Sequence, residues 1–420
     1  RGATRARLRV LVEEARSMSM SVARVLLGRS ASVVAARAPR QRPYRRRRRT
    51  APVAGTRTSS SNAGHEQQQQ QQQQASDQAH QDSAGFPHVS VMLDEVLAAF
   101  EGRPVRTFID GTLGAGGHSS ALAAAHPEMR KLVGLDVDPT AHALAGPRIA
   151  AAAASSELEV DLRLSNFSRL EEQADAAGVL ASGGADGILL DLGVSSMQLD
   201  DRSRGFSFLS PDERADMRMD PQSPLDAATL VNTWSEDEIG RVLREYGEER
   251  RWRSLAARLV RARSERGAPI ETVGELITAM GLPLDRRRGR DKIHPATRAF
   301  QGIRIAVNGE LDVLKAVLPQ AMRALAPGGR LAIISFHSLE DRMVKRAFRE
   351  AEAQTKRPSA EAVAAGFASE PPPRDTDWPD DLPRVRLVNR KAAAPSKNET
   401  EGNKRARSAK LRVLERLPDE

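Results

Sequence analysis

Apolar residues along this chain follow two spacings that alternate from about residue 90 onward. Short, nearly continuous apolar runs are typical of strands that are buried on both faces. Five such runs occur, at 105–110, 131–136, 158–164, 185–191 and 328–337. The stretches between them favour helices, as in the alanine-rich segment 139–154. Strands that alternate with helices predict an α/β fold with an open, doubly wound and mostly parallel sheet.

The connection between the last two runs is too long for a single crossover, because about 140 residues separate Asp191 from Leu331. Two helical stretches are expected there, at 227–262 and 270–280. We therefore expect an inserted helical, substrate-binding subdomain. The predicted organisation is a tail (1–85), a first part of the sheet domain (86–198), the insert (199–301) and a second part with a basic C-terminal arm (302–420).

A glycine-rich turn, DGTLGAGGHS, follows the first run and starts at Asp110. Glycine allows the backbone to bend sharply and to approach a ligand closely. A helix that starts there points free N–H groups over the turn. Asp136 closes the second run 20 positions after Gly116, about the spacing at which an acid meets a nucleotide ribose. A plain tight turn is the simpler alternative, but turn, helix and acid together favour a nucleoside-type cofactor.

The acid that precedes this turn bears on which cofactor binds. A dinucleotide site places a pyrophosphate on G-x-G-x-x-G, and Asp110 would repel it. The same carboxylate would tolerate the sulfonium and ammonium groups of S-adenosylmethionine. The pattern therefore favours a methyltransferase over a nicotinamide-dependent oxidoreductase. Asp110, Asp136, Asp191 and His337 all follow predicted strands, so we expect them at one edge of the sheet.

The composition of the chain excludes several classes of functional site. The chain has no cysteine, which excludes disulfides, zinc ribbons and thiol catalysis. Its eight histidines are scattered without an H-E-x-x-H motif, so no protein-bound metal is expected. No apolar run approaches 18 residues, so no membrane span is expected.

The net charge of +9 is concentrated in the N-terminal tail. Residues 1–65 hold 16 arginines and two acids, so the rest of the chain carries −5. The stretch 15–65 has no acid, is rich in Arg, Ala and Ser, and precedes the polyglutamine run 67–74. This composition predicts an organelle transit peptide and disorder. A nucleic-acid-binding arm is the alternative, because of the run 45–49.

Two further basic segments are candidates for RNA contact. Arg286, Arg287, Arg288 and Arg298 lie in a segment with few acids, which favours contact with phosphates. Arg405 and Arg407 lie in the basic C-terminal segment, for which an ordinary edge strand is an equal alternative. The first arginine cluster of the insert, around 250–263, is interleaved with acids, so it fits a solvated helix face equally well.

Several long motifs resemble one family. They include HVSVMLDEVL from His88, DGILLDLGVSSMQLDDRSRGFSF from Asp186, HPATRAFQGIRIAVNGEL from His294, and LAPGGRLAIISFHSLEDRMVKRAF from Leu325. In this order they resemble the bacterial-type N4-cytosine methyltransferase of small-subunit ribosomal RNA, the MraW/RsmH family. The resemblance covers about residues 86–350 and the last 30 or so.

The resemblance implies a class I, Rossmann-like methyltransferase sheet with an inserted helical domain and S-adenosylmethionine as cofactor. It implies seven cofactor contacts: Gly116, Gly117, His118, Asp136, Phe167, Asp191 and Gln198. It also implies small-subunit rRNA, in the decoding region, as substrate. Ser90 and Lys404 stand where the family often has proline, which affects local loops and not the cofactor site.

Two residues are candidates for assisting the reaction. The exocyclic amine of cytosine is a poor nucleophile, so an acceptor for its N–H is needed. Asp191 and His337 are both placed for this, and the sequence does not choose between them. A non-catalytic RNA-binding assembly factor on the same scaffold is a rival. Four questions stay open: plastid or mitochondrion, the transit cleavage site, naked RNA or assembled subunit, and the oligomeric state, a homodimer included.

Overall fold

The computed structural model describes residues 90–153, 157–208, 210–284, 294–356, 379 and 381–418. Within them, seven strands form one sheet in the order β3-β2-β1-β4-β5-β7-β6. The strands are β1 (Thr107–Asp110), β2 (Lys131–Asp136), β3 (Glu159–Leu164), β4 (Ala185–Asp191), β5 (Leu325–Ser335), β6 (Val385–Leu387) and β7 (Lys410–Arg416). The first five pair in parallel, and β7 runs antiparallel between β5 and β6. The prediction of a doubly wound, mostly parallel sheet is confirmed.

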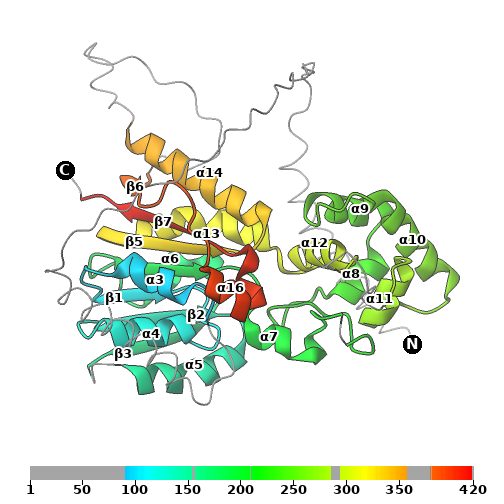
Figure 1. Cartoon of the computed structure of the whole chain (residues 1–420), viewed down its shortest axis with the longest axis horizontal. Helices are drawn as coiled ribbons and strands as arrows, with labels where there is room; N and C mark the ends of the chain where they lie inside the picture. The colour runs from blue at the N-terminus through cyan, green and yellow to red at the C-terminus, as the bar shows by residue number, and fades with distance from the viewer. Residues whose placement is uncertain are drawn as a thin grey trace, which may run out of the picture. The chain divides into compact units, whose positions relative to one another are not determined.

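Successive residues of the central strands enter different cores. Phe108, Leu132 and Leu189 pack into one cluster, together with residues of the helices at 93–100, 117–125 and 139–152. Their neighbours Ile109, Val133 and Leu190 pack into the other, with residues of the helices at 170–176, 310–324 and 338–355. Side chains alternate across a strand, so a continuous apolar run supplies both faces at once. Figure 1 shows these helices around the sheet.

The helices of the sheet domain occupy most of the connections. They are α3 (Leu93–Phe100), α4 (Gly117–Ala125), α5 (Pro139–Ala152), α6 (Leu170–Ala176), α7 (Ser196–Asp200), α13 (Glu310–Ala324), α14 (Ser338–Thr355) and α16 (Lys397–Gly402). Short 3-10 turns are η1 (Phe167–Arg169), η2 (Arg202–Arg204) and η3 (Lys404–Ser408). None of the described helices is both long and apolar enough to cross a membrane.

Between β4 and β5, the described residues form five helices in addition to α7 and α13, and these five pack around a core of their own. They are α8 (Ala227–Thr233), α9 (Glu236–Glu245), α10 (Trp252–Glu265), α11 (Val273–Ala279) and α12 (Thr297–Asn308). We call the segment that carries them, residues 215–308, the insert (Figure 1). The stretch 227–262 is helical as expected, and it is divided into three helices, α8, α9 and α10. Ser235 starts a new helix with a capping box, and Glu248 adopts a left-handed φ of 47° in the turn between α9 and α10.

The C-terminal segment was predicted to be a basic strand or arm, with an ordinary edge strand as the alternative; it is a strand, but it does not lie at the edge of the sheet. β7 lies inside the sheet, with Lys410 to Glu415 paired to β5 and Leu414 to Arg416 paired to β6. Arg412 is buried, and its Nε donates to Asp341 at 2.8 Å. The strand β6 follows a long polar stretch and gave no clear apolar signal of its own. The expected transit peptide and polyglutamine run lie outside the described residues.

Candidate active site

Three carboxylates close neighbouring parallel strands at the same edge of the sheet. Asp110 ends β1, Asp136 ends β2 and Asp191 ends β4. The ends of β1 and β4 are joined through Thr112, whose Oγ1 accepts from the Asp191 N–H at 2.6 Å and whose N–H donates to Asp110 Oδ1 at 3.1 Å. The expected convergence of these acids follows from the parallel register.

The conformation of the glycine-rich turn requires glycine at two positions. Gly114 and Gly116 have φ values of 49° and 74°, a region in which a Cβ is strained. Gly116 also lies against α5, because a Cβ there would be 2.9 Å from Ala145. Gly117 begins α4, and a Cβ on it would lie 2.1 Å from Ser90 Oγ and 3.3 Å from Arg148 Nη1. Gly114 and Gly116 are therefore required by their backbone conformation, and Gly116 and Gly117 also by the residues that lie against them.

Asp136 is held by the turn and keeps acceptor capacity. Its Oδ2 accepts from the Gly114 N–H and its Oδ1 from the Asp138 N–H, both at 2.9 Å. Each carboxylate oxygen has a further lone pair, so the side chain is held in one orientation and can still accept more hydrogen bonds. Burial raises the pKa of Asp136 above its ordinary value.

Asp110 supports the glycine-rich turn from the protein interior and is not exposed at the surface of the site. Its side chain is 1% exposed and accepts from Ser119 Oγ at 2.6 Å. Burial raises its pKa to about 6. The sequence suggested that this carboxylate meets the ligand directly. In the structure it supports the turn and adds negative charge beneath it.

Asp191 accepts fewer hydrogen bonds than the other two carboxylates at this edge of the sheet. Among the described residues, its buried Oδ1 has no hydrogen-bond partner. Burial, followed by the negative charges of Asp110 and Glu340, raises its pKa well above the ordinary value. An unsatisfied carboxylate beside two other acids favours a cationic ligand.

His118 faces this carboxylate as a neutral imidazole. Its Nε2 lies 3.0 Å from the Val91 carbonyl oxygen, which only a protonated Nε2 can bond. Nδ1 therefore carries the lone pair and lies 3.7 Å from Asp191 Oδ2. Burial lowers the pKa of His118 to about 4, so the ring is uncharged near neutral pH.

Phe167 and Gln198 also lie near these groups. A Cβ on Gly111 would be 3.5 Å from Phe167 Cβ, which places the phenylalanine beside the start of the turn. Gln198 is buried, and its Nε2 lies 3.3 Å from both Asp138 Oδ2 and the Met219 carbonyl oxygen. Its Oε1 accepts from the Ser195 N–H at 3.1 Å in the capping box of α7. Gln198 is therefore fixed by the protein itself.

Comparison with known proteins identifies the family. A model of the MraW methylase family matches residues 85–417. A protein named ribosomal RNA small subunit methyltransferase H from Symbiobacterium thermophilum is 44% identical over 333 residues, covering 79% of this chain and 97% of its own. The chain belongs to the MraW methylase family. A relative of the same name from Saccharopolyspora erythraea is 43% identical over 340 residues, covering 80% of this chain and 96% of its own.

The site of this MraW methylase fits S-adenosylmethionine, the methyl donor of the family. Gly116 lets the turn pack closely against Ala145 of α5 at the N-terminus of α4. Asp136 retains acceptor capacity for hydroxyl groups, and Asp191 presents an unsatisfied buried oxygen. No lysine or arginine among the described residues hydrogen-bonds to Asp110, Asp136 or Asp191. The edge is therefore electrostatically suited to a positively charged ligand.

The second catalytic candidate of the MraW methylase, His337, has a structural position. It is the N-cap of α14, and its Nδ1 accepts from the Glu340 N–H at 3.4 Å. The remaining nitrogen, Nε2, must then carry the hydrogen, so no lone pair is left to receive a proton. Glu340 Oε2 accepts from the N–H groups of Phe336 and His337 at 2.8 and 3.2 Å. The ring caps the helix through Nδ1, and its buried Nε2 has no hydrogen-bond partner among the described residues.

Glu310, His337 and Glu340 lie close enough together to resemble a metal site. The tautomer of His337 opposes that reading, because Nε2 holds its hydrogen 3.1 Å from Glu340 Oε1. Both oxygens of Glu310 already accept from Arg304, at 2.8 and 2.7 Å. Glu310 is therefore already paired with Arg304, whose guanidinium also lies within electrostatic reach of Glu340.

The residues expected to contact RNA fall into three groups. Arg286, Arg287 and Arg288 lie outside the described residues. Arg298 and Arg405 are engaged, since Arg298 Nη1 donates to the Glu248 carbonyl at 3.3 Å and Arg405 Nη2 to Asp200 Oδ1 at 2.5 Å. Arg407 is exposed.

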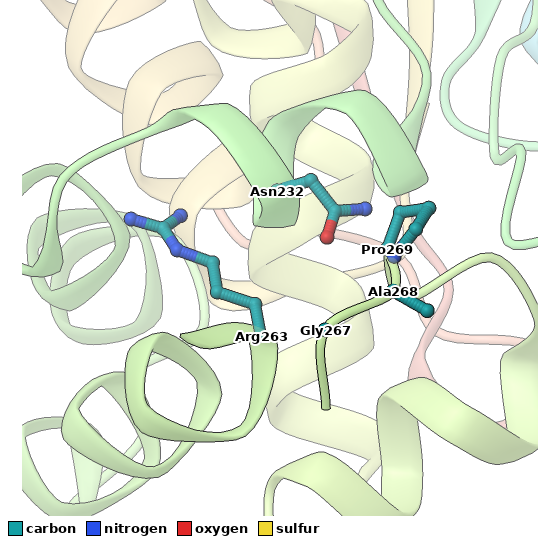
Figure 2. A pocket seen from close by; sticks show the side chains of 5 residues that line it. All are labelled: Asn232, Arg263, Gly267, Ala268 and Pro269. Atoms are coloured by element: carbon teal, nitrogen blue, oxygen red, sulfur yellow. The ribbon is translucent and has the colours of Figure 1, made fainter. Parts of the chain in front are cut away.

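A hollow of about 360 Å³ lies in the insert, lined by Asn232, Arg263, Gly267, Ala268 and Pro269 (Figure 2). Its two polar side chains are occupied by the protein. Arg263 Nη1 donates to the carbonyls of Val231 and Trp234. Asn232 Nδ2 donates to the carbonyls of Ala228 and Ile270, and its Oδ1 accepts from the Ile270 N–H. The hollow includes none of the carboxylates of the sheet edge, and we assign it no ligand.

Asp138 and Arg204 are two residues of the site that sequence reasoning missed. Arg204 Nη1 donates to the buried Asp138 Oδ2 at 2.7 Å. A signal was available, since Asp138-Pro139 after a strand has the form of a helix N-cap followed by proline. The partner of that cap is 66 residues away in the sequence, and nothing local indicates it.

Proposed function

We propose that this MraW methylase transfers a methyl group to the exocyclic N4 amine of a cytidine in small-subunit ribosomal RNA, in the decoding region of an organelle ribosome. The observation that carries the activity is the unsatisfied Asp191 carboxylate beside the glycine-rich turn. The RNA substrate is supported by the small-subunit name of relatives that align over nearly their whole length. The organelle is supported by the arginine-rich composition of residues 15–65.

S-adenosylmethionine supplies an electrophilic methyl group on a sulfonium. We propose that Asp136 accepts from the ribose hydroxyls of this cofactor, because its carboxylate is held by two backbone N–H groups and still has free lone pairs. The cofactor would lie on the surface that Gly116, Gly117 and His118 form in the glycine-rich turn and the first turn of α4. Phe167 would form a wall beside that surface, and Gln198 would contribute from α7, the helix in which it lies.

We propose that Asp191, and not His337, serves the amine. The Asp191 side chain is 25% exposed, and its Oδ1 has no hydrogen-bond partner among the described residues, so the carboxylate could accept an N–H, localise the nitrogen lone pair and later receive the proton. His118 Nδ1 faces the other oxygen of the same carboxylate. Most of the acceleration would come from holding the amine and the methyl group together.

RNA contact remains a proposal for Arg286, Arg287, Arg288, Arg298, Arg405 and Arg407. Arg407 is favoured among the described arginines because it is exposed, whereas Arg405 is engaged with Asp200. The target base must leave its stack to reach a pocket, so the contacts would lie on the RNA that surrounds it. Whether a second copy of the chain takes part is decided by the mass of the complex in solution.

The experiment that tests the function is nucleoside mass spectrometry of organelle small-subunit RNA with and without this protein. Loss of N4-methylcytidine from one cytidine is expected when the protein is absent. The purified chain should restore the mark with S-adenosylmethionine, on naked RNA or on isolated subunits. An intact mark in the absence of the protein would remove the proposed substrate. Binding to the subunit without methyl transfer would instead indicate an assembly factor.

A further inference from the structure

Asp138 connects the cofactor side of the sheet to a helix start. Its Oδ1 accepts from the Thr140 N–H at 3.0 Å and so caps α5. Its own N–H donates to Asp136 Oδ1 at 2.9 Å. Asp138 is 1% exposed. The position of this residue is therefore tied directly to the carboxylate that we assign to the ribose.

Arg204 joins Asp138 to a different segment of the chain. One guanidinium nitrogen, Nη1, donates to Asp138 Oδ2 at 2.7 Å. The other, Nη2, donates to the carbonyls of Arg218 and Met219 at 2.9 and 3.0 Å. Gln198 bonds the same two partners, Asp138 Oδ2 and the Met219 carbonyl. Two side chains thus bridge the same carboxylate to the same short stretch of backbone.

That stretch, residues 217–219, belongs to the insert. Met217 has a left-handed φ of 63° and is buried in the core of the insert. The Met219 N–H donates to Asn308 Oδ1 at 2.7 Å, and Asn308 Nδ2 donates to the Met217 carbonyl at 2.8 Å. Asn308 is the last residue of α12. A continuous set of hydrogen bonds therefore runs from Asp136 through Arg204 to α12.

A second ion pair of the same type provides the comparison. Arg214 donates through Nε and Nη2 to Asp226 Oδ2, at 3.0 and 2.6 Å. Asp226 is also a helix N-cap, since its Oδ1 accepts from the Thr229 N–H of α8. Both partners of this pair lie in or beside the insert, and no hydrogen bond of the pair reaches the sheet edge. The two pairs share their chemistry and differ in what they connect.

We propose that Arg204 is a positioning residue that couples cofactor binding at the sheet edge to the placement of residues 217–219 in the insert. The guanidinium can do this because one nitrogen of its planar fork serves the carboxylate and another serves the two carbonyls, whereas the three donors of lysine all lie on a single nitrogen. Cofactor binding restricts the motion of Asp136. Asp138 is restricted in turn through the hydrogen bond of its N–H to Asp136, and Arg204 extends this restriction to the backbone of Met219. The inference rests on the proposed placement of the cofactor at Asp136.

The test is hydrogen exchange of the full-length protein with and without S-adenosylmethionine, followed by mass spectrometry of peptides that span 216–222. In the wild type the cofactor should slow exchange there by about 5- to 150-fold, the ordinary range of a coupling between sites. In Arg204→Lys the slowing should fall below about twofold. Arg214→Lys is the matched control and should keep the wild-type response. Cofactor affinity is measured in parallel by calorimetry.

Asp138→Asn provides a second variant if Arg204→Lys does not fold, because asparagine still caps α5 while the charge that holds Arg204 is removed. It should lose the response as well. Equal slowing in Arg204→Lys and wild type would overturn the inference, and so would equal loss in Arg214→Lys. If the wild type does not bind S-adenosylmethionine, the proposed function fails instead. Bound cofactor with no slowing in the wild type rejects only the coupling.

Discussion

The sheet edge and the insert bury carboxylates in opposite ways. At the edge, burial raises the pKa of Asp110, Asp136 and Asp191, and none of the three is bonded to an arginine or lysine among the described residues. In the insert, burial acts on Asp226 in the same direction, but hydrogen bonds from Thr229 and Arg214 hold its pKa below the ordinary value. Buried acids that carry their own cation maintain the architecture. Buried acids without one are available to a cationic ligand.

The largest expected effect is on cofactor affinity at the edge. Asp136→Ala should weaken binding of S-adenosylmethionine by about two to four decades, because two charged hydrogen bonds are worth roughly 1.5–3 kcal/mol each. Isothermal titration calorimetry measures this loss directly. Unchanged affinity would show that Asp136 does not bind the ribose. The sheet edge could then no longer be contrasted with the insert as the region that binds the cofactor.

Asp191→Asn should lower the rate of methyl transfer at saturating cofactor by about 10²- to 10⁴-fold, the usual contribution of a positioned acid–base group. The matched variant is His337→Asn, since asparagine also caps helices; its rate should stay within a few-fold of wild type. Single-turnover measurements separate transfer from binding. A large loss in His337→Asn together with full activity in Asp191→Asn would reverse the assignment.

Asp110 should make the stability of the fold depend on pH. Its pKa is about 6 in the folded protein and about 3.9 in an unfolded chain. The folded state therefore holds this proton more tightly, so the associated stability is full below about pH 4 and falls as the pH rises through 6. The loss is on the order of 3 kcal/mol. Urea unfolding of Asp110→Asn should show a shallower decline between pH 4 and 6 than wild type; an identical decline contradicts the assignment.

In the insert, Asp226→Ala should affect stability and leave the cofactor site alone. Removing the cap of α8 and the partner of Arg214 should cost about 1–3 kcal/mol of unfolding free energy. Affinity for S-adenosylmethionine should remain within about twofold. Thermal unfolding and calorimetry on the same sample give both values. A tenfold loss of affinity would mean that the pairs of the insert also serve the ligand.

The smallest effects are expected at the exposed arginines. Arg407→Ala should lower the salt dependence of RNA binding by about one counterion if it contacts a phosphate. Arg405→Ala should change it less, because this side chain is already paired with Asp200. Affinities measured over a range of salt concentrations give the slopes. Equal slopes for wild type and Arg407→Ala would exclude the phosphate contact.

Much of the fold could be predicted because apolar runs and turn chemistry are local signals. The strands that end at Asp110, Asp136 and Asp191 are each read from about six neighbouring residues. β6 and the inner position of β7 could not be predicted in this way. β7 carries outward charges in its sequence, yet Arg412 is neutralised by Asp341 from α14, a residue 71 positions away. Pairing of that kind leaves no trace in a local window.

The residues of the candidate site likewise divide into those that local sequence signals predict and those that they do not. Its glycines and its acids were predicted from spacing, since a parallel sheet brings the ends of its strands to one edge whatever the loops contain. The choice between Asp191 and His337 depended on tautomers and hydrogen bonds. The Val91 carbonyl leaves His118 with a lone pair on Nδ1, whereas the Glu340 N–H uses the one on His337. These partners are defined only once the chain has folded.

The order of strands and helices, the glycine-rich turn, the set of carboxylates and the family could all be predicted from the amino-acid sequence. Those properties depend on residue type and on spacing along the chain. The folded structure was needed to show which carboxylates carry a cation, which histidine retains a free lone pair, and that Arg204 connects the cofactor edge to the insert. The physical reason is that the pKa and the hydrogen-bonding state of a buried group depend on neighbours brought together from distant parts of the chain.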